Sequence, residues 1–354
     1  MTGPRRAALR ATEFAFPSRA VGNEELAAEI KSWSAEQIES KTGIRRRFVV
    51  GPDECASDLA FAAARKLFES GACTPTEIDY LIFCTQSPDY FLPTSACLLQ
   101  HRLALPKSCG ALDINLGCSG FVYGLGLAKG LIETGQARNV LLLTADTYSK
   151  FIHPGDKSVR TLFGDAGAAT LIGSVQSESE RIGPFVYGTD GAGGENLIVP
   201  TGGMRKAFIE NAPPSVDASG NFRTANNLYM NGPEIFNFTL RVVPEMFTDL
   251  LRVAGRKMEE IDLFIFHQAN HFMLEHLRKK LGIPQDRFLV CMRDCGNTVS
   301  STIPIALCMA RADGRLKPGD LLMLVGFGVG YSWAATLVLW AQGPGIGPAE
   351  GDSS

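Results

Sequence analysis

Short apolar runs alternate along this chain with longer amphipathic segments. The amphipathic segments carry apolar residues at helical spacing, as in Phe121, Leu125, Leu127 and Leu131. The apolar runs have the length of buried strands, and clear examples are 80–83, 140–144 and 321–325. Strands that alternate with helices in this way predict an α/β fold.

The same pattern occurs twice. The segment "EIDYLIF" at 77–83 recurs as "EIDLFIF" at 260–266, and "FGDAGAATLI" has a later counterpart in "FGVGYSWAATLV". In the same order, Cys118 and Asn297 each follow a glycine and precede a stretch that we expect to be helical. These matches predict two copies of one α/β unit, with the helix starts at Cys118 and Asn297 facing each other across a pseudo-twofold axis.

The repeat suggests the division of the chain. We expect a first half over residues 1–177, a second half over 178–343 and a flexible tail rich in Gly, Pro and Ser over 344–354. Residues 201–232, rich in Gly, Pro and Asn, predict a long loop. Long loops in compact domains often form lids or binding loops.

Composition narrows the functional class. The 354 residues are 45% hydrophobic and 20% charged, with a formal net charge of −3, so neither a nucleic-acid footprint nor a membrane-binding patch is expected. No apolar run has the length of a membrane span, and the basic N-terminus lacks the apolar core of a signal peptide. Nine cysteines without a CxxC pair favour a reducing cytoplasm over a disulfide scaffold, and their spacing gives no zinc site.

Three residues are candidates for chemistry. Cys118 stands in "GCSG" at a predicted turn between a buried strand and a helix, where it is either a nucleophile favoured as thiolate by the helix N-terminus or a buried structural cysteine. His267 follows a buried strand, the usual place of α/β active sites, although a structural histidine also fits there. Asn297, after a glycine, is either a turn residue or part of a site. His267 and His271 have the interval of a helical metal pair, but no HExxH glutamate lies between them, so no metal site is expected.

The motifs "GCSG", "HQAN", "GNT" and "GFGVG", in this order and at these distances, resemble those of the β-ketoacyl-acyl-carrier-protein synthase III family of thiolase-fold condensing enzymes. "KTGIRRR" (41–47) and "FGDAGAA" (163–169) are also similar to that family, and the resemblance extends over about residues 20–340. It implies two pseudo-symmetric α/β halves in a five-layer αβαβα arrangement.

The resemblance also implies a mechanism. Cys118 would take an acyl group from acyl-CoA or another acyl thioester, while the backbone N–H groups of Cys118 and Val329 hold the oxyanion. Malonyl-acyl carrier protein would then lose CO₂, with His267 and Asn297 donating to the enolate oxygen and Phe327 excluding water. No metal or redox cofactor is implied, and a cytoplasmic homodimer is expected.

Several positions depart from the family pattern. Gln37 stands where acetyl-CoA-using members have a tryptophan, and Lys157 stands where they have the arginine on the other side of adenine. Trp33, four places away, is expected to pack in a helix. Family members often have an arginine after "HQAN" that meets the carrier protein, whereas this chain has "HQANHF", with a basic run at 278–280. Leu92, at a position that reaches the acyl pocket from the partner subunit, replaces a common phenylalanine, which suggests an acyl chain longer than acetyl.

Other functions remain open at this point. One is a non-decarboxylating acyltransferase, and another is a condensing enzyme of a specialised pathway on the same scaffold. A thiolase would need a second catalytic cysteine in the C-terminal Gly-rich loop, which this chain lacks. A catalytically silent partner subunit is the remaining alternative, and the presence of Cys118, His267 and Asn297 together argues against it.

Overall fold

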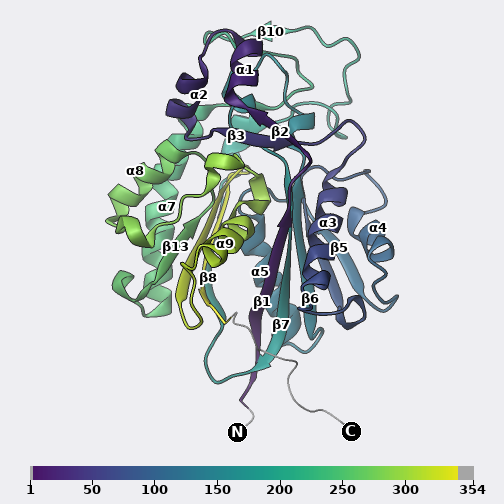
Figure 1. Ribbon diagram of the computed structural model, residues 1–354, viewed down its shortest axis with the longest axis vertical. Coiled ribbons are helices and arrows are strands. Elements are labelled where there is room, and N and C mark those ends of the chain that lie inside the picture. Colours follow the sequence, from purple (N-terminus) through teal and green to yellow (C-terminus); the bar gives the residue numbers. More distant parts are fainter. Residues whose placement is uncertain (1–2, 342–354) are drawn as a thin grey trace.

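A computed structural model describes residues 3–341 and shows two β-sheets side by side (Figure 1). The first sheet has the order β1-β7-β6-β4-β5, with bounds Arg5–Ala15, Ala166–Gln176, Asn139–Asp146, Tyr80–Cys84 and Gly110–Ile114. The second has the order β13-β14-β15-β8, with bounds Leu263–Phe266, Leu321–Gly328, Ser332–Leu339 and Ile182–Thr189. The predicted strands at 80–83, 140–144 and 321–325 are confirmed as parts of β4, β6 and β14.

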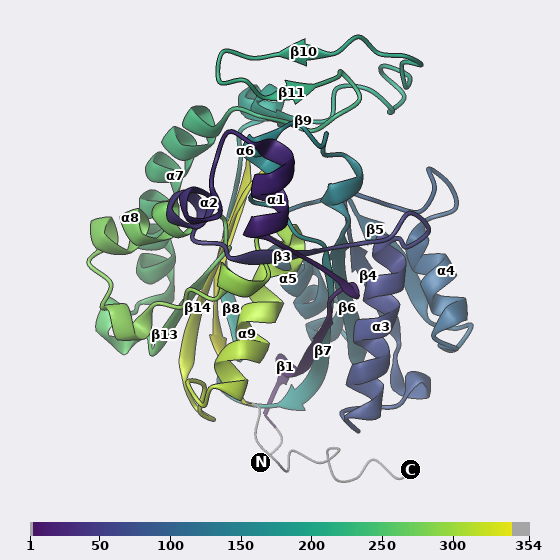
Figure 2. The same ribbon diagram turned by 45° about the horizontal axis from the view of Figure 1, so that its top comes forward.

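Helices form three layers around these sheets (Figure 2). Two helices lie between the sheets: α5 (Gly120–Glu133) and α9 (Thr302–Ala312). The outer face of the first sheet carries α3 (Ala56–Glu69) and α4 (Ser95–Arg102). The outer face of the second carries α7 (Gly232–Ala254) and α8 (His271–Leu281). The expected five-layer αβαβα arrangement is therefore confirmed.

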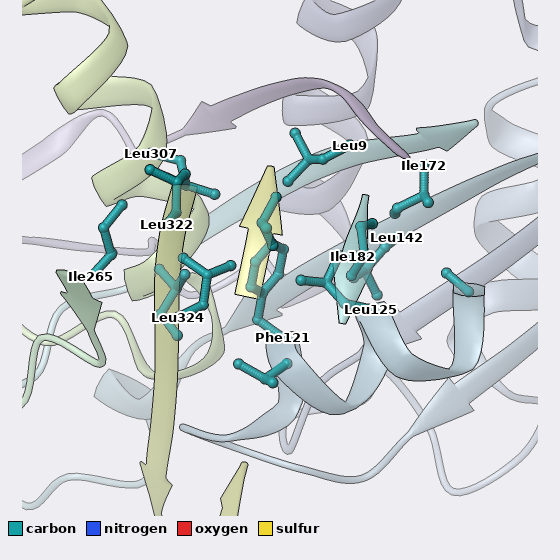
Figure 3. Packing of buried hydrophobic residues seen from close by; sticks show 14 of the residues in the cluster. Leu9, Phe121, Leu125, Leu142, Ile172, Ile182, Ile265, Leu307, Leu322 and Leu324 are labelled. Atoms are coloured by element: carbon teal, nitrogen blue, oxygen red, sulfur yellow. The ribbon is translucent and has the colours of Figure 1, made fainter. Parts of the chain in front are cut away.

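The largest apolar cluster lies between the two sheets (Figure 3). Phe121 and Leu125 of α5 and Leu307 of α9 are fully buried there, against Leu142 of the first sheet and Leu324 of the second. Because both sheets and both inner helices supply side chains to one cluster, the two halves form a single packed unit. The position of Cys118, directly before α5, is thereby held relative to both halves.

The repeated sequences occupy corresponding strands. "EIDYLIF" and "EIDLFIF" form η1 with β4 and η4 with β13, and the "FGD" and "FGV" segments lead into β7 and β15. Corresponding strands also have the same neighbours, since β7-β6-β4 in one sheet matches β15-β14-β13 in the other. The boundary between residues 177 and 178 stays a prediction, and the predicted tail over 344–354 lies outside the described residues.

Smaller elements cover the end of the molecule at which Cys118 lies. They include α1 (Asn23–Ile30), α2 (Ala35–Thr42), α6 (Lys157–Arg160) and the antiparallel pair of β2 (Arg19–Gly22) with β3 (Arg46–Val49). Short strand pairs are β9 (Leu197–Ile198) with β12 (Tyr229–Met230) and β10 (Ser215–Val216) with β11 (Phe222–Arg223). Single 3₁₀ turns are η1 Pro75–Glu77, η2 Tyr148–Lys150, η3 Gly191–Asn196, η4 Met258–Glu260, η5 Gln285–Arg287, η6 Met292–Asp294 and η7 Val299–Ser301.

Four sequence-based expectations need correction. The segment 201–232 is largely a loop, but it also contains three short strands, of which β10 and β11 pair with each other and β12 pairs with β9. Leu127 is 48% exposed, since it faces away from the buried side of α5. The strand before Cys118, β5, is only half-buried because it forms the edge of its sheet. The second helix starts at Thr302 rather than at Asn297, after a 3₁₀ turn.

Candidate active site

Cys118 lies in the turn between β5 and α5, where the second half of the chain approaches it closely. A Cβ added to Gly328 would lie 2.8 Å from the Cys118 sulfur, and one added to Gly326 would lie 2.8 Å from the Ser119 Cα. Only glycine allows the end of β14 to come so near. The "GFGVG" motif is therefore needed for the contact between the two halves at the cysteine.

The backbone around the sulfur is arranged as hydrogen-bond donors. The N–H groups of Val329 and of Cys118 itself both hydrogen-bond to the Cys118 thiol and lower its pKa. The Val329 side chain packs against Gly117 and belongs to the apolar cluster around Cys118. The same donors, one from each half, are placed to bind an oxygen that develops negative charge on a thioester carbon attached to Cys118.

His267 lies directly after the buried strand β13, as predicted, and is 2% exposed. Its Nδ1 is 2.8 Å from the Thr302 hydroxyl, and its ring packs edge-on against Phe327 at 5.6 Å between centroids. Burial lowers the pKa of His267 to about 3, so the ring is neutral at physiological pH. A neutral imidazole can donate a hydrogen bond from one nitrogen while the other is held by the protein.

Asn297 approaches the same point from the loop before α9. Its backbone pairs with Phe163 of the first half, and its side-chain Oδ1 accepts a hydrogen bond from the Val299 N–H at 3.0 Å. Its Nδ2 donates to the Ala269 carbonyl at 3.3 Å and lies 3.5 Å from His267 Nε2. The Asn297 amide and the His267 ring thus converge on one small region.

Cys118, His267, Asn297 and Phe327 line one cavity of about 70 Å³. Its other walls come from the second half and from the segment before β7: Leu162, Phe163, Leu197, Met230, Gly232, Ile235, Ala269, Asn270, Met273 and Gly328. The lining is mostly apolar, which suits an acyl chain near the sulfur. The three residues that the sequence singled out for chemistry are therefore brought together.

The ionisation of Cys118 differs from the expectation. Burial raises the pKa of the thiol to about 12, and the nearby Asp146 carboxylate adds to the rise. Loss of water around the sulfur outweighs the helix N-terminus and the two N–H donors. The sulfur is therefore a thiol at neutral pH in the free protein, rather than the favoured thiolate that the turn predicted.

Asp146 is a buried acid that sequence inspection missed. It ends β6, and its carboxylate accepts hydrogen bonds from the Gln86 N–H at 2.8 Å and from the Ser300 N–H and hydroxyl. Gln86 packs against Gly117, and Ser300 belongs to the loop of Asn297. Burial raises the pKa of Asp146 to about 7. An apolar run that ends in an acid was the available signal, and it is too common to single out this residue.

The predicted substrate-binding residues lie elsewhere. Leu92 is 83% exposed and does not line the Cys118 cavity of its own chain. Gln37 uses its side chain in the capping box of α2, with its Oε1 2.9 Å from the Ser34 N–H. Trp33 lies in the loop before α2 rather than in a helix, and the ammonium groups of Lys41 and Lys157 stand 5.2 and 5.4 Å from its ring.

The segment after "HQAN" begins α8. Asn270 caps this helix through its side chain, and Phe272, 64% exposed, stacks on Phe236 of α7 at 5.7 Å. Of the basic run, Arg278 pairs with Glu275 and Lys280 donates to the Leu240 carbonyl. The start of α8 therefore carries an aromatic pair where a free arginine is usual in the family that the motifs resemble.

A five-layer αβαβα fold that brings a buried cysteine, a neutral histidine and an asparagine to one cavity between its halves defines the class of thiolase-fold condensing enzymes. Comparisons with known proteins agree with this class. The profile described as 3-oxoacyl-[acyl-carrier-protein (ACP)] synthase III matches residues 112–191, and its C-terminal counterpart matches residues 251–340.

Individual proteins are similar over nearly the whole chain. Beta-ketoacyl-[acyl-carrier-protein] synthase III of Caldanaerobacter subterraneus is 36% identical over 87% of this chain and 90% of its own length. A crystal structure of a 3-oxoacyl-(acyl-carrier-protein) synthase III is 56% identical, with a TM-score of 0.94 over 95% of this chain and 100% of that one. The priming β-ketosynthase of the R1128 polyketide pathway is 29% identical, with a TM-score of 0.82 over 97% and 99%.

The chain thus belongs to the β-ketoacyl-acyl-carrier-protein synthase III family, and it is an acyl-transferring condensing enzyme. Members of this family act with acyl carrier protein and acyl thioesters in fatty acid biosynthesis. Within the described residues, 3–341, no helix is both long and apolar enough to cross a membrane.

The close approach at Gly328 can be tested by adding one methyl group. We expect Gly328→Ala to fold but to slow acylation of Cys118 by about 10²-fold, because the new Cβ would displace the sulfur. Gly130→Ala is the matched control, since a Cβ there meets nothing within 4 Å. The measurement is the rate of acyl-enzyme formation by intact mass. Equal rates in the two variants would show that the contact is unimportant.

The effect of Asp146 on Cys118 can be measured by alkylation. At pH 8 the Asp146 carboxyl, with its pKa of about 7, is mostly ionised and opposes the thiolate, so Asp146→Asn should make Cys118 react several-fold faster with iodoacetamide. At pH 6 the carboxyl is mostly protonated and the difference should shrink. Peptide mass mapping separates Cys118 from the exposed Cys97.

Ser300→Ala is a second variant for this experiment. It removes a hydrogen bond that lowers the pKa of Asp146 and keeps the carboxyl group, so more of the carboxyl is protonated at pH 8 and alkylation should also accelerate. If Asp146→Asn accelerates alkylation equally at pH 6 and pH 8, the cause is altered geometry, and the electrostatic explanation is wrong.

Proposed function

We propose that Cys118 is the covalent nucleophile of a two-step condensation in which His267 and Asn297 serve the second step. The observation that carries this proposal is the shared cavity, which Cys118, His267 and Asn297 all line, with the Asn297 Nδ2 3.5 Å from the His267 Nε2. A nucleophile and a separate pair of donors fit a reaction with two half-reactions better than a single nucleophile–base pair does.

In the first half-reaction the Cys118 sulfur attacks the carbonyl carbon of an acyl thioester. The C–S bond of the donor breaks, and the proton of the Cys118 thiol ends on the departing thiol. The carbonyl oxygen carries negative charge on the way and is held by the Cys118 and Val329 N–H groups. Because the free thiol has a high pKa, deprotonation accompanies substrate binding and attack.

In the second half-reaction malonyl-acyl carrier protein replaces the first product. Its C–C bond to the carboxylate breaks, CO₂ leaves, and the electron pair forms an enolate whose oxygen accepts hydrogen bonds from His267 and Asn297. The enolate carbon attacks the acyl-cysteine and releases the Cys118 thiolate, which regains a proton. One such donor typically contributes about 10²–10³ in rate. The sequence of bond changes needs neither a metal ion nor a redox cofactor.

Thr302 decides which nitrogen of His267 carries the proton. Its single hydroxyl proton has two neighbours that accept hydrogen bonds, His267 Nδ1 at 2.8 Å and the Val299 carbonyl at 3.1 Å. Donation toward the enolate from Nε2 requires that the hydroxyl donate to Nδ1. We propose that Thr302 is a positioning residue for this tautomer, and Phe327 keeps water from the ring on its other side.

We also propose a homodimer in the cytoplasm. The edge strand β5 is left unpaired by the described residues of the single chain, and the loop beside it exposes Tyr90, Phe91 and Leu92. Asp113 of β5 accepts hydrogen bonds from the Ser95 and Ala96 N–H groups, which keeps this apolar loop next to the edge. Exposed edges and apolar patches of this kind are usually covered by a partner. All nine cysteines are free, as a reducing compartment favours.

The acyl donor and chain length are proposed from the substrate-binding positions. Leu92 would enter the acyl pocket of the partner subunit and leave room for a chain longer than acetyl. Lys157 and Trp33 would contact the outer part of an acyl-CoA, whereas Gln37 is engaged in its helix cap. A donor held on a carrier protein fits the same site. A specialised pathway fits it too, such as the polyketide pathway to which the R1128 priming ketosynthase belongs.

The two half-reactions separate the proposed roles. Cys118→Ala should abolish acyl labelling, and His267→Ala or Asn297→Ala should cut decarboxylation of malonyl-acyl carrier protein by about 10²-fold while acylation suffers less. The measurements are intact mass after incubation with acyl thioesters and release of CO₂. Equal loss in both half-reactions would indicate a plain Cys–His pair, and acyl transfer without CO₂ release would favour the non-decarboxylating acyltransferase.

The proposed role of Leu92 predicts a change in chain-length preference. Leu92→Phe adds bulk to a packed pocket, where overfilling usually costs about 1–3 kcal/mol, so longer acyl donors should suffer and acetyl should be spared. Leu127→Phe, an exposed leucine on α5, is the control. The chain-length profile of Cys118 acylation tests the role of Leu92 in the pocket, and light scattering tests whether the protein is a dimer. A monomer that acylates at full rate, or an unchanged profile, contradicts the proposal.

A further inference from the structure

A second cavity, of about 210 Å³, lies outside the site described above. Its walls come from the antiparallel β2–β3 pair, α1 and the segment between β6 and β7. The lining joins three arginines and a serine (Arg19, Arg47, Arg160 and Ser149) to an apolar set (Val21, Leu26, Val49, Val50, Ile152, Pro154 and Phe163). A cavity with basic groups at one part and apolar walls elsewhere matches a small amphipathic anion.

Arg47 is the strongest indication of a ligand. It is 1% exposed, and its guanidinium donates only to neutral acceptors: the Asn23 Oδ1 at 2.7 Å and the carbonyls of Val21 at 3.3 Å and Thr161 at 2.8 Å. No carboxylate of the described residues pairs with it, and its buried Nε has no partner. Buried charges in proteins are normally paired, so this cation lacks its counter-charge.

Arg160 adds a second basic side chain to the same cavity. Burial, together with the charge of Arg160, lowers the pKa of Arg47 to about 10, which leaves Arg47 cationic at neutral pH. Arg160 pairs with Glu29 of α1, and Arg19 pairs with Glu25 at 2.6 Å. Both glutamates are well exposed, and exposed ion pairs contribute little, so an anion in the cavity can compete for these arginines.

The remaining polar group limits the charge of the ligand. The Ser149 hydroxyl donates to the Asp165 carboxylate, which also accepts from the Val50 N–H at 2.9 Å. This buried acid next to the cavity disfavours a dianion such as phosphate. We propose that the cavity binds a small organic monoanion, a carboxylate with a short aliphatic tail, with its carboxylate near Arg47 and Arg160 and its tail against the apolar walls.

The cavity is also a neighbour of the active site. Phe163 lines both cavities, and Ile152 packs in the apolar cluster that contains Cys118. A carboxylate in the arginine-lined cavity would hold Phe163 in place and thereby limit the space for an acyl chain on Cys118. This last consequence rests on the proposed function, whereas binding of the carboxylate does not.

Calorimetric titration of the full-length protein tests the proposal with three probes: hexanoate, hexan-1-ol and inorganic phosphate. We expect hexanoate to bind. Hexan-1-ol lacks the negative charge and phosphate lacks the aliphatic tail, so each should bind at least about tenfold more weakly. Equal binding of hexanol would show an apolar cavity only, equal binding of phosphate would show a simple anion site, and no binding of hexanoate would overturn the proposal.

Three variants locate the binding. Arg160→Gln should weaken hexanoate about tenfold, the usual effect of losing a charged hydrogen-bond partner. Glu29→Gln should strengthen it several-fold, because it frees Arg160. Arg65→Gln, in an exposed pair with Glu69 away from the cavity, should change nothing. Arg160 does not line the Cys118 cavity, so unchanged affinity in Arg160→Gln places hexanoate elsewhere and contradicts the proposal.

A folding defect in Arg160→Gln would not remove the test, since Arg19→Gln changes a second lining arginine on the surface and should also weaken hexanoate. Binding needs no catalytic turnover. Retained acyl labelling in Cys118→Ala would contradict the enzyme mechanism and leave hexanoate binding unaffected, so failure of the mechanism and failure of this proposal can be told apart.

Discussion

The closest contact between the two halves of the chain, at Cys118, is the constraint on which the rest of the site depends. The end of β14 meets the turn before α5 so tightly that a methyl group on Gly326 or Gly328 has no room. This contact brings the Val329 N–H to the sulfur and the Cys118 N–H beside it. It is possible because α5 and α9 are buried between the two sheets and prevent the halves from moving apart. The Cys118 sulfur thus has hydrogen-bond donors from both halves.

Burial has opposite consequences for the two titratable groups of this cavity. It lowers the pKa of His267 to about 3 and so keeps the ring in the neutral form that can donate to an enolate. It raises the pKa of Cys118 to about 12 and so keeps the sulfur protonated until a substrate arrives. Both shifts follow from the same loss of water, which disfavours any charged form. A protonated sulfur is also less open to oxidation or alkylation in the absence of substrate.

Hydrogen bonds across the boundary between the two halves fix the position of the loop that carries Asn297. Asp146 at the end of β6 accepts from Ser300, and the next residue, Ser301, bonds with Thr144 of the same strand at 2.9 Å. The following residue, Thr302, then meets His267. Three successive hydroxyl residues thus connect the first sheet to His267 of the second half. The Asn297 backbone adds a pairing with Phe163, the residue that also separates the site from the arginine-lined cavity.

Much of the fold and the three central residues of the site could be predicted from the sequence, because strand-length apolar runs, the repeat and the glycine-flanked motifs are local patterns. The same patterns did not show that Leu127 faces outward, that Trp33 lies between two lysines or that Asp146 and Thr302 belong to the site. These facts depend on which distant segments meet, whereas the Gln37 cap follows from the local Ser34-x-x-Gln37 capping box. The ionisation of Cys118 likewise depends on how completely the whole fold excludes water from the sulfur. This burial cannot be predicted from any short stretch of sequence.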